Sequence, residues 1–408
     1  MIVLIKLAFI LALTIFLLTR KWDLGLILLI DTAIAALLFA YPILDTLRSI
    51  LLGLVAADTL RLVGAVFLML MLAELLRRTQ AMETMVTAMQ IVVPDSRIVL
   101  ALIPAVVGLM PMIGGAMFSA PMINGIGDRL KVSPARKTFV NYWFRHTMEY
   151  VWPLYTSVLL AATLMGITPI EFISASYPLS LAAVASGIVF GLRGIPRGEP
   201  SSAAKSTRSA WRDILVSIWP LLLVILTVVA LQIDMLISLA AVIVLYVAVK
   251  RIGPKEWWDI LRRSFPLKTF SAILGVMVFK RVLEDAGAVQ VVPQALANLG
   301  LPPLVVSFFV PHLIGLLTGT PPAAIALSVP LVAPVLKMTS VSYAVGGVWI
   351  FCGAFSGVLL SPLHLCLALT KEYFEAKWGQ LYRMIAPATA TIIAVALALV
   401  LWSTAAAE

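Results

Sequence analysis

Three ionisable side chains lie close together in one apolar stretch of the chain, residues 138–165. Arg145 and Glu149 are four residues apart and His146 precedes the glutamate by three, so in a helix all three share one face. An ionisable group deep in apolar surroundings is costly and by default marks a functional site. We expect Glu149 with His146 to carry a proton, and Arg145 to bind a carboxylate. The alternative is a structural ion pair of Arg145 with Glu149, with the histidine packed beside it.

Two prolines interrupt the apolar stretches that carry candidate residues. Pro153 lies a few residues after the glutamate, and Pro362 lies two residues before His364. Each proline removes a backbone hydrogen bond, which predicts a broken helix. A neutral histidine can change its charge near physiological pH, so His364 is a second candidate for proton transfer, or else a satisfied interior histidine. Asp31 lies in another apolar stretch, where it forms either a cation or proton site or a pair with a buried donor.

The composition requires a bilayer around these residues. Of 408 residues 62% are hydrophobic and 12% charged, whereas soluble domains are about half apolar and a quarter charged. The net charge of +10 predicts basic cytoplasmic loops rather than nucleic-acid binding. A soluble enzyme, a nucleic-acid binder and a secreted domain are excluded. Cys352 and Cys366 lie in one apolar stretch and are expected to form neither a disulfide framework nor a metal site.

Several apolar stretches approach the roughly 20 residues that a helix needs to cross the hydrocarbon. We expect the first to be a span rather than a cleaved leader, because no small-residue cleavage site follows it. The only long hydrophilic stretch, 193–212, divides the chain in half. The expected spans are 2–19, 24–41, 59–76, 138–165, 170–192, 213–231, 233–250, 266–283, 341–369 and 380–402.

Two further apolar segments, at about 97–127 and 302–336, are interrupted by glycine and proline and predict re-entrant hairpins. The half-helix that starts after each turn offers N–H donors and a positive dipole end to an anion, and nearby hydroxyls bind carboxylate oxygens or a cation. Packed, kinked helices without a ligand are the alternative. The candidate substrate-binding residues are Gly114, Gly115, Ser119, Thr318, Gly319 and Thr320, together with Arg145.

The two halves correspond when the first is shifted by 209 residues. Ser119 then falls on Ser328, and Pro153 on Pro362. Paired segments interrupted by glycine and proline are the sequence pattern of a secondary transporter's binding site. The expected fold is an all-α polytopic membrane protein with two inverted repeats of five transmembrane helices plus one re-entrant hairpin each, with broken helices at the midplane. The repeats cover 1–192 and 213–408, the 193–212 linker is cytoplasmic, and both termini face outward. Twelve full crossings with parallel repeats are the alternative.

The run Pro-Met-Ile-Gly-Gly-Ala-Met-Phe-Ser-Ala-Pro-Met (111–122) and the run Asn-Tyr-Trp-Phe-Arg-His-Thr-Met-Glu-Tyr-Val-Trp-Pro (141–153) resemble a membrane protein family named domain of unknown function 401. The resemblance covers nearly the whole chain. It implies membership of the ion transporter superfamily, beside gluconate, citrate and dicarboxylate permeases, with two inverted repeats in a homodimer. Neither hairpin carries the Ser-Asn-Thr signature of dicarboxylate/sodium symporters, which favours proton coupling over sodium coupling.

The expected function is secondary active transport of a small organic anion, a carboxylate, coupled to protons. We expect no enzyme activity, no cofactor or metal and no nucleic-acid partner; the partners are the anion, the lipid bilayer and a second copy of the chain. The expected location is the inner membrane of a prokaryote. A channel, a cation/proton antiporter and the large membrane subunit of a binding-protein-dependent transporter are the alternatives. No ATP-binding or zinc-hydrolase motif occurs in the sequence.

Overall fold

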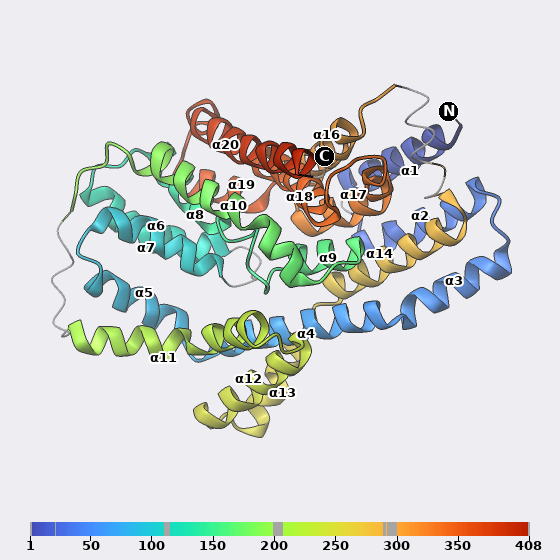
Figure 1. The fold of residues 1–408 in the computed structure, drawn as a ribbon. Helices are drawn as coiled ribbons and strands as arrows, with labels where there is room; N and C mark the ends of the chain where they lie inside the picture. Colours follow the sequence, from blue (N-terminus) through green and yellow to red (C-terminus); the bar gives the residue numbers. More distant parts are fainter. Residues whose placement is uncertain are drawn as a thin grey trace.

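The computed structural model describes residues 2–20, 22–109, 115–198, 207–288, 291 and 300–406. These residues form helices and the turns between them, and none of them lies in a β-strand (Figure 1). Two five-residue π-helical turns, η1 (Ile188–Leu192) and η2 (Leu226–Ala230), extend α10 and α11. The helices are α1 (Ile2–Thr19), α2 (Leu24–Leu38), α3 (Ile43–Val55), α4 (Ala57–Arg78), α5 (Ala81–Val92), α6 (Ser96–Gly108), α7 (Gly115–Arg129), α8 (Pro134–His146), α9 (Thr156–Met165), α10 (Pro169–Gly187), α11 (Thr207–Ile225), α12 (Met235–Lys250), α13 (Pro254–Arg263), α14 (Leu267–Asp285), α16 (Pro303–Thr318), α17 (Pro321–Leu336), α18 (Tyr343–Leu360), α19 (Leu365–Tyr373) and α20 (Trp378–Ala405).

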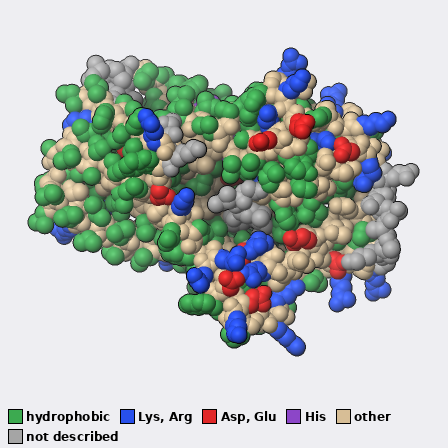
Figure 2. All heavy atoms as spheres, turned by 180° about the vertical axis from the view of Figure 1, so that it is seen from behind, with side chains coloured by type: hydrophobic (Ala, Val, Ile, Leu, Met, Phe, Trp, Pro, Cys, Tyr) green, Lys and Arg blue, Asp and Glu red, His purple; other side chains and the backbone are tan. Residues whose placement is uncertain are grey.

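Five helical segments of the described chain are long and apolar enough to cross a membrane. Hydrophobic side chains also cover much of the outer surface, as Figure 2 shows for one face. A surface of this kind is stable against lipid tails and not against water. The chain is therefore an integral membrane protein. The five segments are Ala57–Arg78, Pro169–Leu192, Thr207–Val228, Tyr343–Tyr373 and Trp378–Ala405.

The observed helices correspond to the apolar stretches expected from the sequence, and three more were not expected. These are α3, α5 and α13, with 13, 12 and 10 residues. Each is too short to reach the span length that the sequence criterion required, and polar residues interrupt its apolar face. Charged side chains are concentrated in the lobe that α13 and the end of α12 form at the bottom of Figure 1, where Arg78 at the end of α4 contacts Asp259 (Figures 1 and 2).

Corresponding helices in the two halves begin 209 residues apart, which is the offset expected from the sequence. α8 begins at residue 134 and α18 at 343. α9 begins at 156 and α19 at 365, and α10 begins at 169 and α20 at 378. Local helix starts are therefore repeated along the chain to the residue.

The two segments expected to form hairpins are each a pair of contacting helices. α6 contacts α7, and α16 is joined to α17 by Gly319 and Thr320 alone. Each first helix packs closely on the next helix of its own half. A Cβ atom at Gly108 of α6 would lie 2.2 Å from the carbonyl oxygen of Arg145, and one at Gly315 of α16 would lie 2.0 Å from that of Ala354. Only glycine permits these approaches.

Each half has a helix that is broken where proline occurs. α8 ends at His146 and α9 begins at Thr156, with Pro153 between them. α18 ends at Leu360 and α19 begins at Leu365, with Pro362 between them. The segment after each break packs against the hairpin of the other half, since α19 contacts α7 and α9 contacts α17. The two breaks and the two hairpins thus meet in the interior.

Candidate functional site

Two histidines from different halves meet between the breaks. His146 is the last residue of α8, and His364 is the residue that precedes α19. Their Nε2 atoms are 3.1 Å apart, and the two ring centroids are 5.0 Å apart at an angle of 67°. Both side chains are buried. The fold therefore joins two sequence candidates that are more than two hundred residues apart.

The other nitrogen of each ring fixes its tautomer. Nδ1 of His146 lies 2.6 Å from the carbonyl oxygen of Tyr142, and Nδ1 of His364 lies 2.6 Å from that of Gly319. A carbonyl oxygen only accepts hydrogen bonds, so both Nδ1 atoms carry a proton and donate. Both Nε2 atoms are left to face each other.

Cys366 completes this cluster from the first turn of α19. Its Sγ atom and the Nε2 or Nδ1 atoms of the two histidines all lie within 4.8 Å of one another, and all three residues are buried. Sequence reasoning missed this residue because a lone cysteine in an apolar helix is usually inert packing. Its only signal was the spacing His364-x-Cys366 directly after Pro362.

Arg145 lies against the start of α7. A Cβ atom at Gly115, the first residue of that helix, would lie 2.4 Å from Nη1 of the arginine, so only glycine leaves room for the guanidinium. Nη1 also donates to the carbonyl oxygen of Val107 at 3.2 Å. Glu149 lies one helical turn further along the chain, buried in the break, where its Oε1 accepts from Ser157 at 3.4 Å. Both charged residues are therefore interior, as expected.

Ser119 lies beside this arginine but is bound by protein. Its Oγ donates to Oδ1 of Asn141 at 2.6 Å. The amide of Asn141 in turn donates to the carbonyl oxygen of Ala116 at 2.9 Å and to Thr370 at 3.3 Å. Asn141, which was not a candidate from the sequence, thus ties α7 to α8 and α19. The serine retains only acceptor capacity toward a ligand.

The turn of the second hairpin places its three candidates differently. Gly319 has a φ of +63°, and its carbonyl oxygen receives the hydrogen bond from His364. Oγ1 of Thr318 is buried and has no hydrogen-bond partner among the described residues, whereas Thr320 is exposed. Gly114 in the first hairpin lies outside the described residues.

Asp31 is separate from the cluster. It lies in α2, which packs against α1 and α14, and its side chain is fully buried. Oδ2 accepts from Thr14 of α1 at 2.6 Å, and Oδ1 has no partner in the described part of the chain. The structure therefore pairs this carboxylate with a buried donor, which was one of the two expectations for it.

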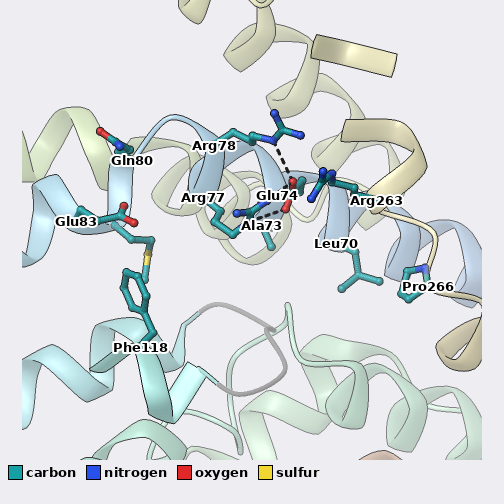
Figure 3. A pocket seen from close by; sticks show the side chains of 11 residues that line it. Leu70, Ala73, Glu74, Arg77, Arg78, Gln80, Glu83, Phe118, Arg263 and Pro266 are labelled. Atoms are coloured by element: carbon teal, nitrogen blue, oxygen red, sulfur yellow. Dashed lines mark hydrogen bonds and ion pairs between the residues drawn. The ribbon is translucent and has the colours of Figure 1, made fainter. Parts of the chain in front are cut away.

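Two cavities, each of about 520 Å³, flank the interior at opposite ends of α4. The first has a charged wall, in which Nη2 of Arg77 lies 2.5 Å from Glu74, and Phe118 of α7 lines it from the opposite side (Figure 3). The second lies by Asp58 and Arg61 at the start of α4 and is lined by Leu159 and Thr163 of α9.

The family model for the protein of unknown function DUF401 matches residues 2–402. The chain belongs to this family. No curated protein matches it. One solved structure is similar to the DUF401 protein at 13% sequence identity, covering 87% of this chain and 82% of that chain with a TM-score of 0.48. It is described as "Structure and Function of Neisseria gonorrhoeae MtrF Illuminates a Class of Antimetabolite Efflux Pumps". At that TM-score the likeness supports no conclusion.

Most residues singled out from the DUF401 sequence meet in one place. The arginine, the two histidines and the glutamate all come from the two breaks or directly precede them. The first hairpin reaches them through Gly115, and the second through Gly319. Asp31 stays apart, and Cys366 and Asn141 join the cluster as residues that the sequence did not single out.

Proposed function

We propose that the DUF401 protein is a secondary active transporter of a small organic anion, with a carboxylate as the group it recognises. The observation that carries the proposal is the placement of Arg145 against the first residue of α7. A guanidinium presents five N–H donors in a fixed fork, which matches a carboxylate bidentately. The start of a helix adds free N–H groups and a positive dipole end. A carboxylate between them accepts hydrogen bonds from both.

The two cavities support alternating access to that position. They lie at opposite ends of α4, whose 22 residues span about 33 Å at 1.5 Å per residue. The hydrocarbon is about 30 Å thick, so the cavities open toward opposite sides of the membrane. Phe118 in the first cavity precedes Ser119 of the site, and Leu159 in the second follows Ser157 by two residues. Each cavity thus ends close to the interior cluster from its own side.

We further propose the inverted-repeat topology for this transporter, with five crossings and one re-entrant hairpin in each half. The common offset of 209 residues and the exchange of contacts between hairpins and breaks support it. The basic residues near the linker also gather together: Lys137 binds Asp128 at 2.7 Å, and Gly198 accepts from the backbone N–H of Ser96 at 3.3 Å. This side is the cytoplasmic one in the proposal, and both termini face outward from the inner membrane. A homodimer is the proposed assembly.

Glu149 is the proposed coupling residue, and the coupling ion is a proton. Its carboxylate is buried, and its hydrogen bond from Ser157 is long at 3.4 Å. A carboxylate that gains a proton there loses the cost of a buried charge. Sodium would instead require several oxygen ligands around it. His146 and His364, the other coupling candidates, are assigned a different role below.

A cation/proton antiporter is the second candidate. Asp31 favours it, because its Oδ1 atom is buried and without a partner among the described residues. That function requires Asp31 and Glu149 to share one cation, and they are bound by different partners, Thr14 and Ser157. The anion transporter is therefore the better-supported proposal.

Counterflow in proteoliposomes tests the proposed function. A panel of labelled mono-, di- and tricarboxylates is offered with and without an inward pH gradient. We expect saturable exchange of at least one carboxylate, and its loss in Arg145→Gln but not in Arg129→Gln, which removes an exposed arginine from the end of α7. Uptake that does not saturate, or that is equal in the two variants, contradicts the proposal.

A further inference from the structure

We propose that His146, His364 and Cys366 form a binding site for a zinc-like transition-metal ion. The proposal does not depend on transport, and it goes beyond the transporter function because it gives the junction of the two halves a bound cation. It revises the expectation, drawn from the sequence, that the cysteines offer no metal site.

The contact between the two Nε2 atoms requires a positively charged species. Both Nδ1 atoms donate to backbone carbonyls, so two neutral rings present two lone pairs to each other across 3.1 Å. Facing lone pairs repel each other in surroundings where no water screens them. A cation bound by both nitrogens converts this repulsion into two coordination bonds.

The donor atoms suit a borderline transition-metal ion. Imidazole and thiolate together select zinc and its neighbours, whereas calcium and magnesium take oxygen ligands. Nitrogen and sulfur ligands of tetrahedral zinc, at about 2.0–2.3 Å from the ion, stand roughly 3.3–3.6 Å apart. The nitrogens are already 3.1 Å apart, and the sulfur lies within 4.8 Å of both histidines. A movement of roughly 1 Å therefore completes the geometry.

The surroundings of the two histidines are those of metal ligands. A histidine that binds a metal usually donates its other ring N–H to a carboxylate or a backbone carbonyl, which holds the ring in place. Tyr142 and Gly319 provide those carbonyls at 2.6 Å. Gly319 belongs to the turn of the second hairpin, so the metal would fix α8, α19 and this hairpin to one another.

Three protein ligands leave a fourth position for water or another oxygen donor. A divalent ion bound by one thiolate retains one positive charge. Glu149, one helical turn after His146, carries the opposite charge in the same interior region. The site is thus close to neutral, which a buried cluster requires.

A single proton shared by the two histidines is the competing explanation of the contact. It needs neither the sulfur nor any added ion. Cys366 therefore separates the two explanations, since only the metal requires its thiolate. Cys352 supplies the matched control, because it is equally apolar in its surroundings, fully buried and outside the cluster.

The first experiment uses the full-length protein, purified in detergent and loaded with Zn²⁺ or Co²⁺. We expect one equivalent of tightly bound metal by mass spectrometry of the elements. The Co²⁺ form should show the thiolate-to-cobalt charge-transfer band and the visible bands of a tetrahedral ion. This measurement needs no variant. Folded wild-type protein that retains no metal, or a Co²⁺ spectrum without the thiolate band, overturns the proposal.

The second experiment compares Cys366→Ser, His364→Gln and Cys352→Ser by competition with a chelator. Loss of outer-shell partners alone typically weakens metal binding about 10–100-fold, so loss of a direct ligand should weaken it more than about 100-fold. Cys352→Ser should bind as the wild type does. Size-exclusion elution confirms that each variant is folded. Equal metal affinity in Cys366→Ser and Cys352→Ser assigns the contact to a shared proton and overturns the proposal.

Discussion

Tyr155 and His364 lie 209 residues apart and make equivalent contacts in the two halves of the chain. Each is the residue before the helix that follows a break, α9 or α19. The hydroxyl of Tyr155 donates to the carbonyl oxygen of Gly108, the last residue of α6. Nδ1 of His364 donates to that of Gly319, directly after α16. Both contacts attach a hairpin to a break, but only the imidazole has a second nitrogen, and that nitrogen meets His146.

Loss of the first of these contacts should destabilise the fold. In Tyr155→Phe the carbonyl oxygen of Gly108 has no hydroxyl to accept from, and an unsatisfied buried acceptor costs about 1–3 kcal/mol. We expect a lower midpoint of thermal unfolding in detergent. The control is Tyr177→Phe, at an exposed position of α10, which should leave the midpoint unchanged. Equal midpoints in the two variants would show that the contact does not hold the hairpin.

The close packing of each hairpin on its neighbour should not tolerate a methyl group. In Gly108→Ala and Gly315→Ala the new Cβ atom meets a backbone carbonyl oxygen at 2.2 and 2.0 Å, and backbone cannot move aside as a side chain can. We expect a loss of at least about 1–3 kcal/mol of stability from overpacking. Gly125→Ala in α7 is the control, because nothing lies within 4 Å of its Cβ position and alanine favours a helix. The same unfolding measurement compares them, and a stable Gly315→Ala protein would contradict the helix spacing.

Some features of the fold could be predicted from the sequence because they are local. Pro153 and Pro362 break their helices wherever the helices pack, so both breaks were predictable. The helices α3, α5 and α13 were not, since short helices with polar faces do not meet a criterion based on apolar length. The meeting of His146 with Cys366 depends on how two halves of the chain pack. Periodicity and composition hold no information on such a contact, and the structure alone reveals it.

The topology can be tested with single cysteines on the described termini and linker. Ile2→Cys and Ala406→Cys should react with a membrane-impermeant maleimide from outside the cell, and Arg197→Cys only after permeabilisation. The native Cys352 and Cys366 are buried and should stay unlabelled in each background. Five crossings in each half place both termini on one side and the linker on the other. A C-terminus that reacts only from the cytoplasm would contradict the odd number of crossings and the inverted repeats with it.

The coupling role of Glu149 makes a prediction that separates coupling from folding. Glu149→Gln keeps the shape of the side chain and its contact with Ser157 but removes the group that gains and loses a proton. We expect carboxylate exchange to continue while acceleration by an inward pH gradient disappears. Glu372→Gln, at an exposed position of α19, is the control and should keep the acceleration. If the glutamate only neutralises Arg145, the variant should instead unfold at a lower temperature, and any exchange that remains should respond to the gradient as before. A well-folded Glu149→Gln protein that is still driven by protons would remove this residue from the coupling mechanism.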